Sequence, residues 1–459
     1  MSPAIRPDPA AAPAIERIEL RLLSLPFSAG RRDDDAGSAG TETVDSFNAS
    51  SRTFTAMQSL IVAVTTEDGR TGWGEAFGHR TNPATWAALE EIVGPFFLGE
   101  PADAAGLRPR AEYAFHAFGR TGPVHYALSA IDSALWDLAA QRAGVPLRRL
   151  IDAGARDSIG AYASLVHYGE DPAEVARQVA RARDAGFGAF KLHECTVPAV
   201  AAAREAAGEA PLMVDVNCHW DEAGADAALA ELAELDLCWL EEPVFPPDDR
   251  DALARLNARH GIVSAGENAS GTRGLIGDMA AGAVAIAQPS VGKIGGVSAM
   301  LEVYDAGARL GVPVVPHCFY YGPALLATAQ LIAALPVQRY RGGPGADAGS
   351  ALPELEVPFL DWPERLHPLH GHHQEHGHHQ EQGHHQEQGD HREHDGDRAG
   401  SHHPAADPAA GRGLGHNGVV PARARAGAGT VVLPEAPGLG FEPDPGVMER
   451  HTVQRATIS

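Results

Sequence analysis

The chain has 459 residues, too many for one ordinary hydrophobic core, so we expect more than one domain. Its formal net charge of −24 argues against nucleic acid or an anionic membrane as a partner, although an anionic substrate could still bind beside a cation. The N-terminus does not resemble a signal peptide, and no apolar run is long enough to span a membrane. Four cysteines without a CxxC pair indicate reduced thiols, so we expect a cytoplasmic protein.

The first part of the chain predicts a small α+β unit. We expect a disordered tail over residues 1–13, rich in proline and alanine. Apolar and β-branched runs then predict strands at 16–26, 57–66 and in TGWGEAFG, with a tight turn at Glu67–Arg70. The polar segment Ser28–Ser51 is too long for an ordinary hairpin loop, which indicates a loop that is either mobile or functional. Helical periodicity follows, over 82–93 and over 123–143, where Gly144 ends the helix.

From about residue 157 the pattern changes to short apolar strands that alternate with helices. The strand candidates are SIGAYASL, GAFKLH, LMVDVN, CWLEEP, IVSAGEN, AVAIAQPS and VPVVPHC. Such alternation predicts a parallel barrel or a doubly wound sheet. Polar residues at the carboxyl ends of nearly all these strands favour the barrel, because barrel enzymes keep their sites on that face.

Three acidic residues, Asp215, Glu241 and Glu267, follow three successive strand candidates at equal intervals. Carboxylates at the ends of neighbouring parallel strands converge on one face, and hard oxygen ligands suit Mg²⁺. Lys191 and His193 alternate at the end of GAFKLH and therefore share a face, and either could serve as a general base. His317 ends VPVVPHC and could face them across the barrel mouth. Two asparagines close to the acids, Asn217 and Asn268, could bind substrate oxygens or orient the carboxylates.

A histidine-rich repeat interrupts the chain after the barrel. Units such as GHHQEH and GHHQEQ follow one another between residues 371 and 394, almost without apolar residues, so we expect disorder over 367–429. Such a segment could store Zn²⁺, Ni²⁺ or Cu²⁺, or it could be a tolerated low-complexity expansion. Its ligands are too soft for it to be the Mg²⁺ site.

An ordered series of motifs resembles the mandelate racemase and muconate lactonizing enzyme branch of the enolase superfamily. The series runs ALWDLAAQRAGVPLRRLI, KLH, DVN, WLEEP, GEN, KIGGV and PGLGFEPD. The resemblance implies a modified (β/α)₇β TIM-type barrel over 151–366, and an α+β capping domain over 14–150 that is completed by 430–455 of the C-terminal segment 430–459. It also implies one Mg²⁺ on Asp215, Glu241 and Glu267, which stabilises the enediolate formed when a carboxylate substrate loses its α-proton.

Two positions depart from the pattern of this family. His193 stands where the family carries the second lysine of Lys-x-Lys, and Ser290 stands where racemase-like members carry an aspartate that charges the histidine equivalent to His317. We therefore expect His317 to be less basic than in the relatives and to act as an acid, with Lys293 either supplying a replacement charge or forming a structural ion pair. The family also implies a glutamate on the last strand, for which ALPELEVPF offers Glu354 or, as we prefer, Glu356.

These residues predict a Mg²⁺-dependent dehydration of a sugar acid to a 2-keto-3-deoxy acid. Lys191 and His193 would form the base side, His317 the acid, and Asn217, Asn268, Ser290, Lys293 and Glu356 the substrate contacts. The enzymatic alternative is an α-racemase or epimerase, and the alternative from another class is a non-catalytic metal-binding protein. We expect a homo-oligomer, and we look for substrate selection in Ser28–Ser51 and Phe77–Arg80.

Overall fold

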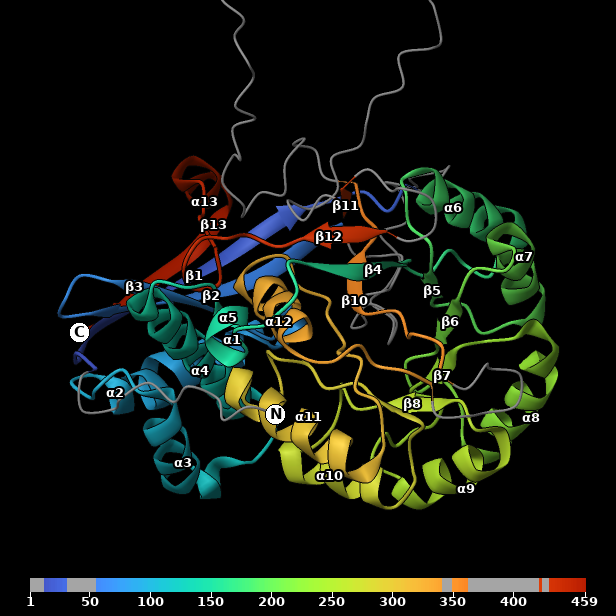
Figure 1. The fold of residues 1–459 in the computed structure, drawn as a ribbon, viewed down its shortest axis with the longest axis horizontal. Coiled ribbons are helices and arrows are strands. Elements are labelled where there is room, and N and C mark those ends of the chain that lie inside the picture. The colour runs from blue at the N-terminus through green and yellow to red at the C-terminus, as the bar shows by residue number, and fades with distance from the viewer. Residues whose placement is uncertain (1–11, 31–54, 341–348, 362–420, 423–428) are drawn as a thin grey trace, which may run out of the picture.

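The computed structural model describes residues 12–30, 55–340, 349–361, 421–422 and 429–459. The tail before residue 12, most of Ser28–Ser51, and the histidine-rich repeat lie outside these described residues. Two units stand side by side: an antiparallel sheet with helices, and a ring of parallel strands surrounded by helices (Figure 1). None of the described helices is both long and apolar enough to cross a membrane.

The capping unit contains a four-stranded antiparallel sheet in the order β13-β1-β2-β3. Its strands and helices are β1 Ile15–Pro26, β2 Ala56–Thr66, β3 Thr71–Ala76, α1 Asn82–Ala88, α2 Gly94–Phe97, α3 Ala104–Ala114, α4 Pro123–Ala143, α5 Leu147–Ile151, α13 Pro445–His451 and β13 Thr452–Ile458. The predicted hairpin is present, because β2 and β3 pair antiparallel around the turn. The chain's last strand, β13, pairs with its first, β1.

Helix α4 forms the core of the capping unit, and its length matches the sequence prediction. Gly72 and Gly74 of β3 lie directly against the helix backbone, where added Cβ atoms would stand 2.2 and 2.0 Å from Ala134 O and Ala130 O. Only glycine permits so close an approach of strand and helix. The helix ends at Gly144, whose φ of 68° is the left-handed conformation that suits glycine.

The second unit is the modified TIM-type barrel that the sequence predicts. Its elements are β4 Ser158–Ser164, α6 Pro172–Asp184, β5 Phe190–Leu192, α7 Val197–Ala207, β6 Leu212–Asp215, α8 Glu222–Leu232, β7 Trp239–Glu241, α9 Arg250–His260, β8 Val263–Ala265, α10 Gly271–Ala280, β9 Ile286–Ala287, α11 Gly296–Leu310, α12 Pro323–Ala334 and β10 Leu355–Pro358. Strands β4 to β9 pair in parallel and in chain order, and β10 returns to pair in parallel with β4. Helices α6 to α10 lie outside the curved sheet (Figure 1).

The segment expected as the strand VPVVPHC is less regular than predicted. Only Val314 forms a ladder contact, an isolated parallel bridge to Ala287. Pro313 and Pro316 have no N–H to give to a ladder, which explains the interruption. The segment still occupies a strand position, because His317 N donates to Pro289 O at 3.1 Å.

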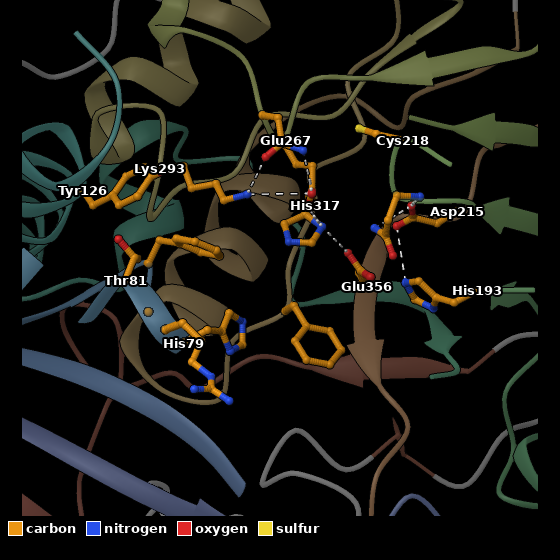
Figure 2. Close-up of a pocket in the computed structure, with 16 residues that line it drawn as sticks. His79, Thr81, Tyr126, His193, Asp215, Cys218, Glu267, Lys293, His317 and Glu356 are labelled. Carbon is orange, nitrogen blue, oxygen red and sulfur yellow. Dashed lines mark hydrogen bonds and ion pairs between the residues drawn. The ribbon is translucent and has the colours of Figure 1, made fainter. Parts of the chain in front are cut away.

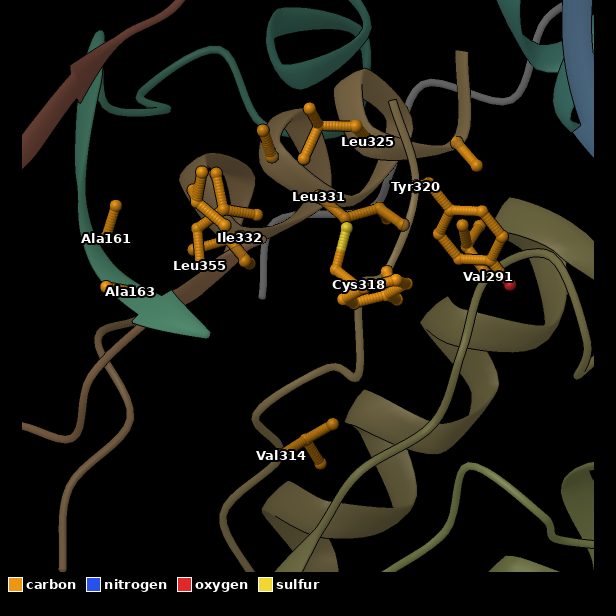
Figure 3. Close-up of a cluster of buried hydrophobic side chains, with 14 of the residues drawn as sticks. Ala161, Ala163, Val291, Val314, Cys318, Tyr320, Leu325, Leu331, Ile332 and Leu355 are labelled. Carbon is orange, nitrogen blue, oxygen red and sulfur yellow. The ribbon is translucent and has the colours of Figure 1, made fainter. Parts of the chain in front are cut away.

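Helix α12 is buried along its whole length between the two units. Leu331 and Ile332 of this helix belong to one apolar cluster with Cys318 and with Leu355 of β10 (Figure 3). All four cysteines are free, and of these Cys318 is buried while the other three are partly exposed.

The C-terminal segment divides between the two units, which differs from the expectation that 430–459 packs on the capping domain. Its first strand, β12 Thr430–Val432, pairs antiparallel with barrel strand β4 and with the short strand β11 Pro421–Ala422. Leu439 N then donates to Asp137 of α4 at 2.7 Å, and only β13 joins the capping sheet.

Candidate active site

A cavity of about 400 Å³ lies where the carboxyl ends of the barrel strands meet the capping unit (Figure 2). This volume is typical of small-molecule sites. The lining residues are Phe77, Gly78, His79, Arg80, Thr81 and Tyr126 of the capping unit, and His193, Asp215, Asn217, Cys218, Glu267, Asn268, Lys293, His317, Phe319 and Glu356 of the barrel.

The three predicted metal ligands come from neighbouring strands. Asp215 and Glu241 are the last residues of β6 and β7 and stand in register, and Glu267 follows β8. Parallel pairing brings these ends together, as the sequence predicts. Asp215 and Glu267 line the cavity, whereas Glu241 is fully buried.

Lys191 is fully buried among the carboxylates. Its Nζ lies 3.1 Å from Asp215 Oδ2, 3.1 Å from Glu241 Oε2 and 2.8 Å from Glu356 Oε1. Burial lowers the pKa of Lys191, but the three carboxylates outweigh it and hold the pKa well above its usual range. Lys191 therefore balances negative charge below the cavity, which it does not line.

The residue types at this point fit a hard divalent cation. Glu241 Oε1 is buried and makes no hydrogen bond, so it is available as a ligand. Burial and the charge of Asp215 raise the pKa of Glu241 to about 8, a repulsion that a cation would relieve. As the side chains stand, no three His, Cys, Asp or Glu groups in the described part of the chain are placed to hold a metal, so the proposed ligands would have to change position to bind one.

His193 is held from both ring nitrogens. Its Nδ1 contacts Leu165 O, and its Nε2 lies 3.4 Å from Asp215 Oδ2. A backbone carbonyl can only accept, so Nδ1 carries a proton and Nε2 faces the acidic cluster. Burial lowers the pKa of His193, but Asp215 outweighs it and the pKa is raised. His193 and Lys191 thus both reach Asp215, as their alternation along the strand predicts.

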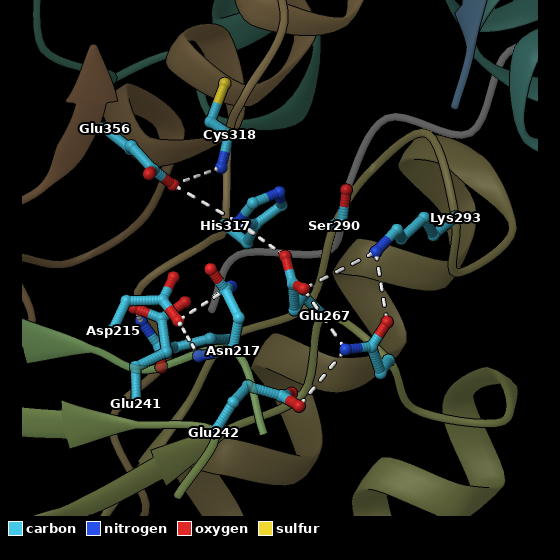
Figure 4. Close-up of polar contacts among 12 residues, drawn as sticks. Asp215, Asn217, Glu241, Glu242, Glu267, Ser290, Lys293, His317, Cys318 and Glu356 are labelled. Atoms are coloured by element: carbon cyan, nitrogen blue, oxygen red, sulfur yellow. Dashed lines mark hydrogen bonds and ion pairs between the residues drawn. The ribbon is translucent and has the colours of Figure 1, made fainter. Parts of the chain in front are cut away.

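His317 lies beside two carboxylates that the sequence argument did not consider. Its Nδ1 lies 2.9 Å from Glu267 Oε2 and 3.4 Å from Glu356 Oε2 (Figure 4). The contact with Glu267 is not aligned as a hydrogen bond. Burial lowers the pKa of His317, but these two carboxylates outweigh it, so the pKa is raised above its usual value. The sequence argument considered only the residue at position 290, and a lower basicity than in the relatives stays a prediction.

Ser290 does not line the cavity, contrary to its prediction as a substrate contact. The residue is fully buried, and its hydroxyl lies 2.6 Å from the hydroxyl of Tyr320. At the position where the resemblance implies an aspartate, Ser290 therefore forms a neutral hydrogen bond with Tyr320 and is not part of the cavity wall.

The remaining predicted contacts combine cavity lining with support of the acids. Asn217 Nδ2 donates to Asp215 Oδ1 at 2.9 Å, and Asn268 Nδ2 donates to Glu242 Oε2 at 3.1 Å and to Glu267 Oε1 at 3.2 Å. Lys293 Nζ lies 3.4 Å from Asn268 Oδ1 and 3.8 Å from Glu267 Oε1. The same Nζ stands 4.2 Å from the ring centroid of Phe77, which connects the barrel to the capping unit.

The two candidate glutamates on the last strand have different surroundings. Glu356 lines the cavity, accepts from Ser164 Oγ at 2.7 Å and from Cys318 N at 2.7 Å, and contacts Lys191. Glu354 lies immediately before β10 and pairs with Arg156 at 2.7 Å. Only Glu356 is therefore placed to meet a substrate.

Sequence reasoning missed several cavity residues. Tyr126 and Phe319 are large aromatic side chains in the wall, and Cys218 lies beside Asn217. Phe319 follows His317 closely and could have been found from that position. Tyr126 lies on the capping helix α4, and its sequence carries no signal that this turn meets the barrel.

Comparisons with known proteins agree with this geometry. The model described as "Mandelate racemase / muconate lactonizing enzyme, N-terminal domain" matches residues 40–152, and "Enolase C-terminal domain-like" matches residues 174–349. The chain is 30% identical to L-talarate/galactarate dehydratase of Salmonella typhimurium, over 56% of this chain and 67% of that protein. It is 31% identical to D-galactarolactone cycloisomerase of Agrobacterium fabrum, over 65% of this chain and 81% of that protein.

A solved structure with the same fold is L-talarate dehydratase from Polaromonas sp. JS666, complexed with Mg and L-glucarate. It superposes with a TM-score of 0.68 at 21% identity and covers 97% of this chain and 99% of its own. These relatives are all named as enzymes, which does not support the non-catalytic alternative. The chain is therefore an enzyme of the mandelate racemase and muconate lactonizing enzyme family within the enolase superfamily.

Proposed function

We propose that this enzyme removes the proton α to a substrate carboxylate with the help of Mg²⁺, and that it dehydrates a sugar acid to a 2-keto-3-deoxy acid. The observation that carries the proposal is one cavity that holds the barrel histidines His193 and His317 together with the carboxylates of Asp215, Glu267 and Glu356. Elimination of water needs a base for the α-proton and an acid for the leaving hydroxyl, and two ionisable rings in one cavity can supply both.

His193 is the proposed base. The Leu165 carbonyl fixes its tautomer, so that Nε2 lies on the side of Asp215 and the acidic cluster. His317 is the proposed acid, because Glu267 and Glu356 favour its protonated form. A protonated imidazole can give its proton to the hydroxyl that leaves the β-carbon.

Asp215, Glu241 and Glu267 would hold the Mg²⁺. When bound, the cation would supply positive charge against the negative charge that builds on the substrate carboxylate. Lys191 would balance the carboxylates from below, and Glu356 would contact the substrate carboxylate. Asn217, Asn268 and Lys293 line the cavity and are the proposed contacts to the substrate's hydroxyl groups.

The substrate class is supported by the relatives. The matched proteins include dehydratases of talarate, galactarate and galactonate, and the Polaromonas structure was solved with Mg and L-glucarate. A polyhydroxylated acid also suits a cavity lined by amides, histidines and cations. A cytoplasmic, homo-oligomeric enzyme remains our expectation.

An epimerase or racemase is the second candidate. The specific observation in its favour is that His317 has two carboxylate neighbours, which raise its pKa and so help it to take a proton. Two bases on either side of one carbon would allow a proton to leave from one face and return to the other.

The proposal is tested with purified protein, Mg²⁺ and a panel of sugar acids, by assaying 2-keto acid formation. We expect at least one acid to be dehydrated and Asp215→Asn to abolish that turnover, because the amide cannot act as an anionic ligand. Asp226→Asn is the matched control, since Asp226 pairs with His260 on the outer surface at 2.8 Å, and this variant should keep full activity. Turnover that survives in Asp215→Asn would contradict the proposed mechanism.

A further inference from the structure

Glu75, at the end of β3, is a buried carboxylate outside the catalytic cluster. It is 3% exposed, and none of its hydrogen-bond donors among the described residues is a cation. Its Oε1 accepts from the hydroxyl of Ser59 on β2. Its Oε2 accepts from Gly322 N at 3.2 Å and from Ala324 N at 3.1 Å, both in the barrel unit.

These barrel N–H groups belong to the start of helix α12. The first N–H groups of a helix have no partner within the helix, and a side-chain oxygen at the N-cap usually accepts from them. Here the N-cap is Gly322, which has no side chain, and the start of α12 is buried, which leaves little room for water. Glu75 therefore caps a helix of one unit from a strand of the other.

The two segments that Glu75 joins form facing parts of the cavity wall. Downstream of Glu75 the capping chain enters Phe77–Thr81, all of which lines the cavity. Upstream of Gly322 the barrel chain carries His317 and Phe319, which line it from the other side. Where the two segments meet, the ring centroids of His79 and Phe319 lie 6.1 Å apart.

A backbone hydrogen bond ties the capping segment to another part of the barrel. Phe77 N donates to Gly292 O at 3.3 Å, and the Phe77 ring lies against Lys293. This bond does not reach the segment His317–Gly322, so loss of Glu75 would remove the hydrogen bonds described above and leave the N–H groups of Gly322 and Ala324 without their side-chain acceptor.

We propose that Glu75 is a positioning residue, which fixes the capping segment Phe77–Thr81 against the barrel segment His317–Gly322 and thereby sets the shape of the substrate cavity. Glu75 does not line the cavity itself, so its effect on substrate would be exerted through these two segments. The kinetic part of this role rests on the proposed function, whereas its structural part does not.

Two substitutions separate the hydrogen bonds from the charge. Glu75→Ala removes every bond, whereas the amide of Glu75→Gln can still accept from Gly322 N and Ala324 N and can donate to Ser59 Oγ. Burial raises the pKa of Glu75 to about 7, so a neutral side chain is already close to the native state of this group. Asp137→Ala is the matched control, because Asp137 is equally buried and accepts from Trp73 N and Leu439 N away from the cavity.

We expect Glu75→Ala to raise KM for the productive sugar acid about tenfold or more, with Glu75→Gln restoring it to within about threefold of the wild type. The Mg²⁺ dependence should not change, because the proposed metal ligands lie on β6 to β8. In hydrogen–deuterium exchange, segments 77–81 and 317–324 should exchange faster in Glu75→Ala and at the wild-type rate in Glu75→Gln. Asp137→Ala should lose stability without either effect.

An unchanged KM in Glu75→Ala would overturn the proposed role, and so would the same rise in Asp137→Ala, which would indicate general loosening of the domains. If the wild type turns over no sugar acid, the proposed function fails. Hydrogen–deuterium exchange then tests the positioning role of Glu75 by itself. Unaltered exchange of 77–81 and 317–324 in Glu75→Ala would refute the positioning role in that case too.

Discussion

The two barrel histidines of the cavity differ in what holds their rings. His193 is fixed between a backbone carbonyl and Asp215, whereas His317 contacts two carboxylates through one nitrogen. Carboxylates raise the pKa of both rings, so charge alone does not separate their roles. We assign the base role to His193 because the Leu165 carbonyl keeps the proton on Nδ1 and leaves Nε2 to exchange one, and the acid role to His317 because two carboxylates favour its protonated form.

The assignment predicts that the two half-reactions can be separated by mutation. In D₂O, His193→Ala should lose both α-proton exchange and 2-keto acid formation. His317→Asn should keep α-proton exchange while dehydration falls about a hundredfold or more, because only the departure of the hydroxyl needs the acid. Both are measured on one sample by proton NMR and a keto-acid assay.

His260→Ala is the matched control for both variants, since His260 is bonded to Asp226 outside the cavity, and it should behave as the wild type. Loss of exchange in His317→Asn would reverse the assigned roles and favour His317 as a base.

At the residue level, the sequence predicted the position of the three metal-ligand candidates better than it predicted the neighbours of His317 and Ser290. Asp215, Glu241 and Glu267 were predictable because strand periodicity fixes which residues end each strand. The environment of His317 was not, because Glu267 and Glu356 reach it from other strands, across distances that no local pattern encodes. The prediction of Ser290 as a substrate contact did not hold for the same reason, because its hydrogen-bond partner Tyr320 comes from a separate segment.

At the level of elements, buried carboxylates of helix α4 join it to the barrel, to strand β3 and to the C-terminal segment. Asp132 accepts from Ser298 N of α11 at 2.9 Å, and Asp137 accepts from Trp73 N of β3 at 2.8 Å and from Leu439 N at 2.7 Å. Neither of these two donors to Asp137 is a cation, and burial raises the pKa of Asp137 from 3.8 to about 6. Its folded state therefore binds a proton more tightly than its unfolded state.

This shift predicts how Asp137 affects stability as pH changes. The favourable contribution of the protonated group is complete below pH 3.8 and is lost as the pH rises through about 6. The free energy of unfolding of the wild type minus that of Asp137→Asn should therefore fall by about 3 kcal/mol between pH 4 and 7. Urea denaturation of both proteins at several pH values measures it, and a difference that stays constant or rises with pH would contradict the explanation.

Long elements with a clear period were the most predictable. The bounds of α4 follow from helical spacing and from Gly144, and the β2–β3 hairpin follows from its turn residues. The segment around Val314 was harder, because apolar content predicted a strand while Pro313 and Pro316 prevented a continuous ladder. The pairing of β12 with β4 depends on a return of the chain over a long stretch, and local sequence does not specify it.

At the level of the whole molecule, the cavity exists only where the two units meet. The barrel supplies every proposed metal ligand and the two proposed acid–base residues, His193 and His317. The capping unit supplies Phe77–Thr81 and Tyr126. The proposed reaction type could therefore be predicted from barrel motifs. Substrate selection is expected to depend on the position of the cavity residues that the capping unit supplies. Glu75 matters at this scale, since one carboxylate joins a capping strand to a barrel helix.

The most direct test of the proposed chemistry is proton NMR of the wild-type enzyme with Mg²⁺ and the sugar-acid panel in D₂O. Removal of the α-proton predicts that at least one acid loses its α-proton signal, either by deuterium exchange or by conversion to a 2-keto-3-deoxy product. Full retention of the α-proton signal by every acid in the panel, with enzyme shown to be folded and Mg²⁺ in excess, would contradict α-proton abstraction from this substrate class.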